Sequence, residues 1–188
     1  MQTKKRDFSG RFNQKYRSNH DVFGDTVLSV VKDAMKYASS GEALDLGAGN
    51  GRNTLFLISQ SFKVTSVDTS EEGLNILKER VKEKEKLETV LSDVREFETD
   101  KKYDIIIATG LLHFLSKEGG VGLIKKIQRW TKRDGVNVLG AKMFQNMRGD
   151  LPHIFEHNEL RQYYETKEWD IKYYSENGVA FLTAKRIS

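Results

Sequence analysis

The chain has 188 residues, of which 38% are hydrophobic and 31% charged, and its formal net charge at pH 7 is +4. This length predicts one domain, residues 1–188, with enough chain for a real core. No run approaches the roughly 20 apolar residues of a membrane span, and no apolar segment follows the first residues as in a signal peptide. Cysteine is absent, which excludes disulfides and thiolate metal sites. We therefore expect a cytoplasmic protein that has no need of an anionic partner.

The N-terminal part predicts a helical lid or cap over residues 1–40, ahead of a core at 41–188. Residues 11–19 are polar with aromatics, and an apolar helical pattern runs from Asp21 to Ala38. In the core, strand and helix patterns alternate. We expect strands at 43–46, 62–68, 87–91, 103–108 and 136–141, with helices from 52, at 70–86 and around 123–130.

The last part of the chain predicts a hairpin. An irregular stretch, 142–155, is followed by a helix at 158–166 and strands at 169–174 and 179–185, which the turn residues Asn177 and Gly178 join. The alternation before it predicts an α/β fold: a mostly parallel, Rossmann-like seven-stranded sheet with helices on both faces and an antiparallel strand at the C-terminal hairpin.

The segment 43–53, ALDLGAGNGRN, predicts a strand, a glycine turn and a helix start. Gly47, Gly49 and Gly51 permit positive φ and the close approach of a ligand, and a helix start favours a polar group. The dinucleotide fingerprint needs a glycine where Arg52 stands, which disfavours an NAD-dependent oxidoreductase.

An acidic residue, Asp45, precedes this glycine loop. Its carboxylate would repel a pyrophosphate but attract an ammonium or sulfonium group. S-adenosyl-L-methionine carries both groups, so the loop favours this cofactor.

Two more acids end the next strands in the chain. Asp68 and Asp93 follow the second and third predicted strands, and Thr109 ends the fourth. Ligands of open α/β sheets bind at these carboxyl ends. Asp68 follows Gly47 by about 20 residues, the spacing at which an acid reaches ribose hydroxyls. Asp93 can accept from an adenine amino group while Val94 packs on the ring.

The motifs LDLGAGNGRNTLFL, VTSVDTS, LSDV and YDIIIATGLLHFL resemble those of class I S-adenosylmethionine-dependent methyltransferases. The segments GNGRNTLFL, GLIKKIQRWTKRDG and FEHNELRQYYETKEWDIKYY are similar to the tellurite-resistance (TehB-type) family, over roughly residues 12–186. The resemblance implies the class I methyltransferase fold. With Asp45, the implied cofactor residues are Tyr16, Gly47, Ala48, Gly49, Gly51, Arg52, Asn53, Asp68, Thr69, Asp93, Val94 and Thr109.

Candidate catalytic residues follow the fourth and fifth strands. Methyl transfer needs a base only if the acceptor loses a proton, and His113 is the best-placed one, although it also fits as a packing residue. Arg148 is a candidate for binding an anionic acceptor or a solvated loop residue. His153 and His157 are four residues apart without a third ligand, so we expect no metal site.

The expected reaction is methyl transfer to a small molecule, with a metalloid oxyanion such as tellurite as one candidate. The family carries a longer segment with a His-Arg pair between its last two strands, which Ser175–Gly178 lacks. A non-catalytic S-adenosylmethionine sensor or partner module stays open. A nucleic-acid methyltransferase is disfavoured, because Thr109–Leu112 lacks the Asn/Asp-Pro-Pro-aromatic tetrapeptide. We expect no membrane association and a monomer or homodimer.

Overall fold

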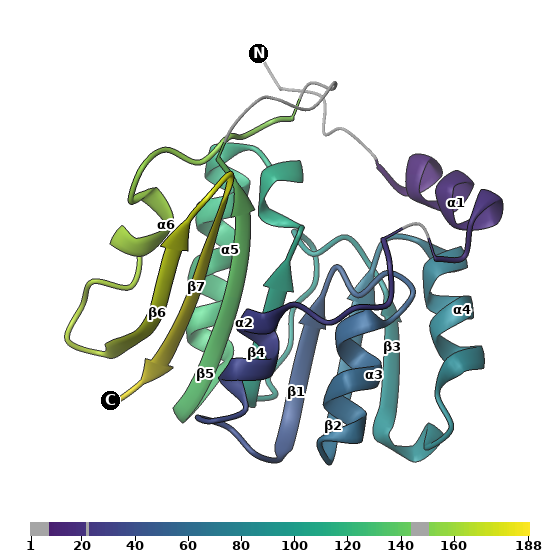
Figure 1. Ribbon diagram of the computed structural model, residues 1–188, viewed down its shortest axis with the longest axis horizontal. Helices are drawn as coiled ribbons and strands as arrows, with labels where there is room; N and C mark the ends of the chain where they lie inside the picture. The colour runs from purple at the N-terminus through teal and green to yellow at the C-terminus, as the bar shows by residue number, and fades with distance from the viewer. Residues whose placement is uncertain (1–7, 22, 144–150) are drawn as a thin grey trace.

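The computed structural model describes residues 8–21, 23–143 and 151–188. Within them, seven strands form one sheet in the order β3-β2-β1-β4-β5-β7-β6 (Figure 1). The strands are β1 (Gly41–Leu46), β2 (Phe62–Asp68), β3 (Leu87–Leu91), β4 (Tyr103–Thr109), β5 (Thr131–Lys142), β6 (Trp169–Glu176) and β7 (Val179–Arg186). All neighbouring strands from β3 to β5 pair in parallel, whereas β7 is antiparallel to both β5 and β6. The predicted mostly parallel sheet with an antiparallel hairpin is confirmed.

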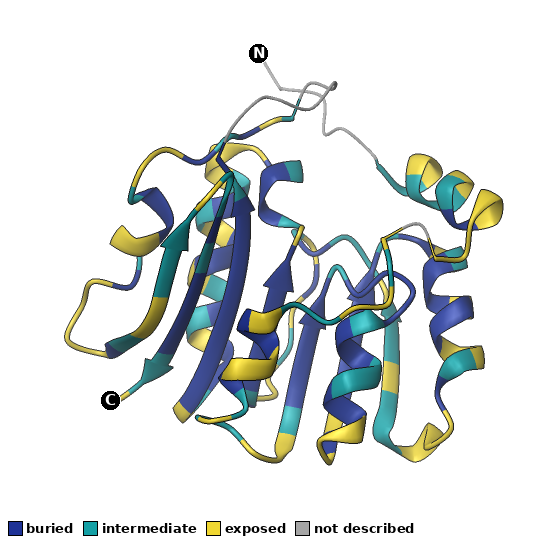
Figure 2. Cartoon of the chain, viewed as in Figure 1, coloured by how far each residue is buried: buried dark blue, intermediate teal, exposed yellow. Residues whose placement is uncertain are grey.

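Helices cover both faces of the sheet, as predicted. They are α1 (Ser9–Ser18), α2 (Ser29–Ala34), α3 (Arg52–Ser59), α4 (Glu71–Arg80), α5 (Lys117–Trp130) and α6 (Glu159–Gln162), with the 3₁₀ turns η1 (Lys84–Lys86) and η2 (Leu112–Phe114). Buried residues of α2, α3 and α4 share one apolar cluster, and those of α5 and α6 share the other. Figure 2 shows the sheet buried between these layers. No helix in the described part of the chain is long and apolar enough to cross a membrane.

Two serine side chains fix the starts of helices at the carboxyl edge of the sheet. Ser70 Oγ accepts from the Gly73 amide, and Ser116 Oγ accepts from the Gly119 amide, both at 3.1 Å. Such caps satisfy amides that lack a partner within the helix. The cap at Ser70 begins α4 directly after β2.

The N-terminal helix predicted over 21–38 is wrong in its bounds. Only Ser29–Ala34 is α-helical there, and a separate helix, α1, lies at Ser9–Ser18. The chain turns between them at Gly24, whose φ is +71° and whose amide bonds to Asp21 O. A left-handed residue ends a helical run, so the apolar periodicity that continued past Gly24 was misleading.

Two boundaries near the C-terminus also differ from the prediction. Strand β5 begins at Thr131, directly after α5, and not at Val136. Asp134, with φ +63°, and Gly135 form an irregularity within the strand, where the register with β4 shifts. Helix α6 is confined to four residues.

Candidate functional site

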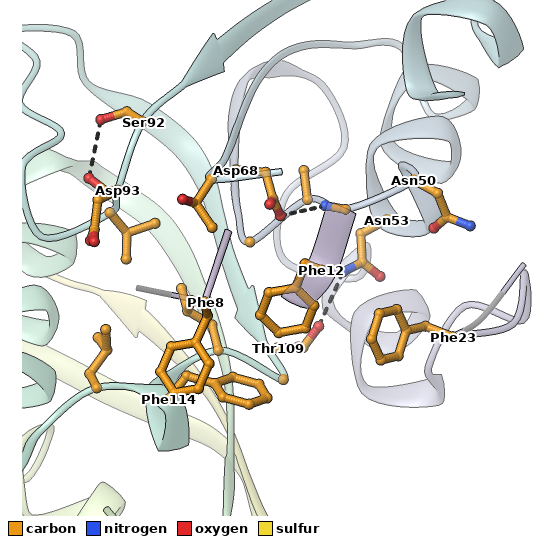
Figure 3. Close-up of a pocket in the computed structure, with 18 of the residues that line it drawn as sticks. Phe8, Phe12, Phe23, Asn50, Asn53, Asp68, Ser92, Asp93, Thr109 and Phe114 are labelled. Carbon is orange, nitrogen blue, oxygen red and sulfur yellow. Dashed lines mark hydrogen bonds between the residues drawn. The ribbon is translucent and has the colours of Figure 1, made fainter. Parts of the chain in front are cut away.

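A cavity lies at the carboxyl ends of β1, β2 and β4, beneath α1 (Figure 3). Eleven of the predicted cofactor residues line it: Tyr16, Gly47, Ala48, Gly49, Arg52, Asn53, Asp68, Thr69, Asp93, Val94 and Thr109. They come from five separate segments of the chain. The sheet topology therefore brings together side chains that the sequence scatters over half of its length.

The glycine loop is held by its own amides. Gly47 N and Ala48 N both donate to Val67 O of β2, at 2.8 and 3.1 Å, and Gly49 N donates to Asp68 Oδ2 at 2.8 Å. These three amides tie the loop to the neighbouring strand. Recognition of a polar ligand then falls mainly to the side chains around the loop.

Gly49 and Gly51 are required by packing as well as by backbone conformation. A Cβ on Gly49 would lie 2.1 Å from the Tyr16 hydroxyl, and one on Gly51 would lie 2.2 Å from Leu77 of α4. Gly51 does not line the cavity. Its positive φ of 92° and its close approach to α4 require a glycine at this position whether or not a ligand is bound.

Asp68 ends β2 and faces the cavity while two backbone amides hold it. Its Oδ2 accepts from Gly49 N, and its Oδ1 accepts from Ser70 N at 2.7 Å. Burial raises the pKa of this carboxyl, and these hydrogen bonds oppose that shift. A carboxylate has about four lone-pair positions, so Asp68 retains the capacity to accept from ligand hydroxyls.

Asp45 lies beneath the cavity and does not line it, contrary to the expectation of direct ligand contact. The Thr54 hydroxyl donates to its Oδ2 at 2.7 Å, while its Oδ1 has no partner among the described residues. Burial raises the pKa of Asp45 to about 6. Asp45 therefore supports the first turn of α3 from below.

Asn53 connects this buried layer to the cavity. Its Nδ2 donates to Thr109 Oγ1 at 3.1 Å, which joins the start of α3 to the end of β4. Its Oδ1 is buried and, within the described residues, has no hydrogen-bond partner. The Asn53 side chain also interacts with the Asp45 carboxyl group, so it joins the buried acid to the cavity lining.

Asp93 and Val94 lie at the end of β3, on another wall. Arg95 holds the Asp93 carboxylate through its backbone amide at 2.9 Å and through its guanidinium group. Val94 is only 5% exposed and belongs to the core cluster. This wall offers an apolar surface beside an oriented carboxylate.

Polar contacts tie α1 and the following turn to the rest of the site. Asn13 Oδ1 accepts from Ser70 Oγ at 2.7 Å, and Arg17 pairs with Glu72. Asn50 Nδ2 donates to His20 O at 2.8 Å. The N-terminal segment is thus seated on α4 and on the glycine loop, where it covers the cavity.

The candidate base, His113, does not face the cavity. It is 3% exposed in η2, its ring lies 4.4 Å from that of Phe114, and its Nδ1 has no partner in the described part of the structure. Burial, and secondarily Lys142, lowers the pKa of His113 to about 4. Phe114, and not His113, lines the cavity, and this geometry does not favour His113 as a base.

The other candidates lie elsewhere. Arg148 is outside the described residues. His153 Nε2 lies 3.1 Å from Glu159 Oε1, whereas His157 pairs with Glu176, so the two histidines have different partners. They do not come together at the cavity.

Sequence reasoning missed four phenylalanines that line the cavity: Phe8, Phe12, Phe23 and Phe114. The signal was available for two of them. Phe8, Phe12 and Tyr16 repeat at every fourth position, which places them on one face of a helix. The aromatics of the N-terminal segment were recognised without this periodicity.

The sheet order, with helices on both faces and a ligand cavity at the carboxyl ends, defines the class I methyltransferase fold. Residues 1–185 match the family model described as "Tellurite resistance protein TehB". The chain belongs to the TehB family, as the sequence motifs predicted.

Two relatives from Haemophilus influenzae support this assignment. The chain is 36% identical over 182 residues to a protein named "Probable S-adenosyl-L-methionine-dependent methyltransferase TehB", covering 93% of this chain and 58% of the relative. The crystal structure of TehB from that species superposes with a TM-score of 0.77 at 30% identity, covering 95% of this chain and 66% of the other. The chain thus spans about 58% of the length of its curated relative.

A more distant structure shares the fold. The N-methyltransferase NodS from Bradyrhizobium japonicum, solved with S-adenosyl-L-homocysteine, has a TM-score of 0.78 at 12% identity. The match covers 97% of this chain and all of the other.

Proposed function

We propose that the chain is an S-adenosyl-L-methionine-dependent methyltransferase that acts on a small molecule. The observation that carries this proposal is the arrangement of Asp68, Asp93 and Asn53 around one cavity at the carboxyl edge of the sheet. Membership of the TehB family and the name of its Haemophilus relative support the same cofactor.

The residues present suit the parts of this cofactor. Asn53, which lines the cavity at the start of α3, suits the ammonium group of the methionyl end. Asp68, next to the glycine loop, suits the ribose diol. The apolar surface of Val94 and the carboxylate of Asp93 suit the adenine ring and its amino group.

The chemistry asks the protein for alignment more than for acid–base catalysis. The bound cofactor would supply an electrophilic methyl group on a sulfonium. Holding the acceptor in line with that group can offset roughly 7–11 kcal/mol of the barrier. Thr109 and Asn53 orient the methionyl side of the cavity, and α1 excludes water from above.

Calorimetric titration with S-adenosyl-L-homocysteine tests the cofactor assignment. Asp68→Asn should weaken binding by about 10- to 100-fold, because hydrogen bonds to a charged group contribute roughly 1.5–3 kcal/mol. Asp170→Asn, on exposed β6, is the matched control and should bind normally. Because Asp68 also holds Gly49 and Ser70, thermal unfolding of each variant is measured in parallel. Unchanged affinity in a folded Asp68→Asn protein would remove the ribose assignment.

Turnover separates an enzyme from a cofactor sensor. Release of S-adenosyl-L-homocysteine is measured with a panel of small acceptors, tellurite included. Product formation supports the methyltransferase, whereas tight cofactor binding without product from any acceptor favours the sensor. We further propose a cytoplasmic location and a monomer or homodimer, which fractionation and light scattering test.

A further inference from the structure

One wall of the cavity is built from aromatic rings. The ring centroids of Phe8 and Phe12 each lie 5.3 Å from that of Phe114, and both pairs are edge-to-face. Phe12 lies 6.2 Å from Phe23. We call the rings of Phe8, Phe12 and Phe114 the phenylalanine wall. They are half-buried and line the cavity, so their remaining surface is open to a ligand.

The phenylalanine wall lies across the cavity from the acidic residues. In Figure 3, Phe8 and Phe114 lie below Asp68 and Asp93, on the other side of the cavity. Leu111 and Leu115 extend the apolar lining beside Phe114. The polar wall accounts for the proposed cofactor, which leaves the phenylalanine wall for the second substrate.

The apolar character of the phenylalanine wall argues against an oxyanion as that substrate. The cationic side chains of the described lining are Arg52 and Arg95. Arg52 donates to Phe23 O at 3.1 Å, and Arg95 is paired with Asp93. An oxyanion entering between phenylalanine rings would lose hydration that these apolar side chains cannot replace. A flat uncharged ring would instead gain edge-to-face contacts.

The described lining also lacks a well-placed proton acceptor. The carboxylate of Asp68 is held by two amides, that of Asp93 by Arg95, and the hydroxyl of Tyr16 lies against Gly49. His113 lies outside the cavity lining. An acceptor that reacts through a lone pair, without losing a proton, suits this arrangement.

We infer that the methyl acceptor is an uncharged, planar heteroaromatic compound whose ring nitrogen carries a free lone pair, stacked against Phe8, Phe12 and Phe114. This inference rests on the proposed function. The nitrogen lone pair forms the new N–CH₃ bond as the S–CH₃ bond breaks. The electron pair of the broken bond stays on sulfur, which becomes a neutral thioether. The positive charge passes from sulfur to the ring nitrogen, and no proton is released. The aromatic faces stabilise the cationic product through cation–π contacts.

The test uses quinoline, isoquinoline and 4-methylpyridine at pH 8, with tellurite as the competing acceptor class. Each is titrated into protein saturated with S-adenosyl-L-homocysteine, and N-methylated product is sought by mass spectrometry in reactions with S-adenosyl-L-methionine. We expect binding and the fixed-charge N-methyl cation from at least one heteroaromatic. Phe114→Ala should weaken that binding about 10-fold.

Matched variants separate the two proposals. Tyr173→Ala removes an aromatic side chain that is 48% exposed on β6, away from the cavity, and should change nothing. S-adenosyl-L-homocysteine affinity should stay within about threefold in Phe114→Ala, because the wall faces the acceptor. Failure of the wild-type protein to bind S-adenosyl-L-homocysteine would overturn the proposed function itself.

If the protein binds S-adenosyl-L-homocysteine normally, three outcomes would overturn the acceptor assignment and leave the proposed function intact. The first is that no heteroaromatic compound binds. The second is binding without N-methylation. The third is turnover of tellurite that Phe114→Ala leaves unchanged.

Discussion

The hydroxyl group of Tyr16 occupies the space that a side chain on Gly49 would fill. A Cβ on Gly49 would lie 2.1 Å from this oxygen, and Tyr16 itself is only 4% exposed. Tyr16 belongs to α1 and Gly49 to the loop after β1, so this contact locks the N-terminal helix onto the glycine loop. The second glycine of the loop is thus needed for the covering helix to seat.

Gly49→Ala should therefore destabilise the protein for two reasons. Its φ of +55° is left-handed, which costs a side-chain-bearing residue about 1–2 kcal/mol, and the new methyl group meets the Tyr16 hydroxyl. In a Tyr16→Phe background the second cost should shrink, so the two substitutions should couple by about 1 kcal/mol. Urea unfolding of the four proteins measures this coupling.

Gly178→Ala is the control for backbone strain alone. Gly178 has φ +70°, and nothing lies within 4 Å of where its Cβ would be. Its cost should be independent of Tyr16. Equal costs of Gly49→Ala in the two backgrounds would show that the hydroxyl does not press on the loop.

The sheet could be predicted from sequence because its signals are local. The parallel strands contain short apolar or alternating runs, and the Asn177–Gly178 turn marks the hairpin. Helix α1 could not be placed so easily. Of its residues only Tyr16 is buried. The rings of Phe8 and Phe12 pack against Phe114, about one hundred residues further along the chain. The partner of this helix is set by tertiary structure, which periodicity does not reveal.

The sequence predicted which residues lie near the cavity better than it predicted which neighbours those residues contact. Strand ends identified Asp68, Asp93 and Thr109 as cavity residues. The rule that ligands bind at the carboxyl ends of strands also predicted ligand contact for Asp45. At the end of β1, however, Gly47 lines the cavity, whereas Asp45 lies beneath it. Which of the two faces a ligand depends on the side-chain direction, and Thr54 takes Asp45 into the buried layer.

Asp45 predicts a pH dependence of stability. Its folded pKa of about 6 lies above the usual value of 3.8 because the carboxyl is buried. The folded state therefore binds this proton more tightly than the unfolded state, and the stability gained at low pH is lost as the pH rises from about 4 to about 6. Two pKa units correspond to roughly 3 kcal/mol.

Asp45→Asn, which keeps an acceptor for Thr54, should remove that slope. The free energy of unfolding of each protein is measured by urea denaturation from pH 4 to 7.5. We expect the wild-type value minus the variant value to fall across pH 4–6 and then level off. Parallel curves would mean that Asp45 titrates normally.

Glu159 anchors the segment after β5 to α6. It is 7% exposed, lies 3.1 Å from His153 Nε2 and accepts from Glu156 N at 2.9 Å. Glu159→Leu should cost about 1–3 kcal/mol, because it leaves buried donors without a partner. Glu165→Leu is the control: its pair with Arg161 is exposed, so its loss should cost under about 1 kcal/mol. Similar melting shifts for both variants would contradict the anchoring role.

The last prediction concerns His113, the residue that sequence analysis favoured as a base. Its ring is buried outside the cavity lining, its Nδ1 lacks a partner among the described residues, and burial lowers its pKa to about 4. His113→Leu should therefore keep kcat within about threefold and leave the profile of kcat/KM against pH unchanged. A general base would contribute about 100- to 10,000-fold. Phe114→Ala, one residue along η2, should raise KM for the acceptor without this loss of kcat. A hundredfold fall in kcat for a folded His113→Leu protein would restore His113 as the base.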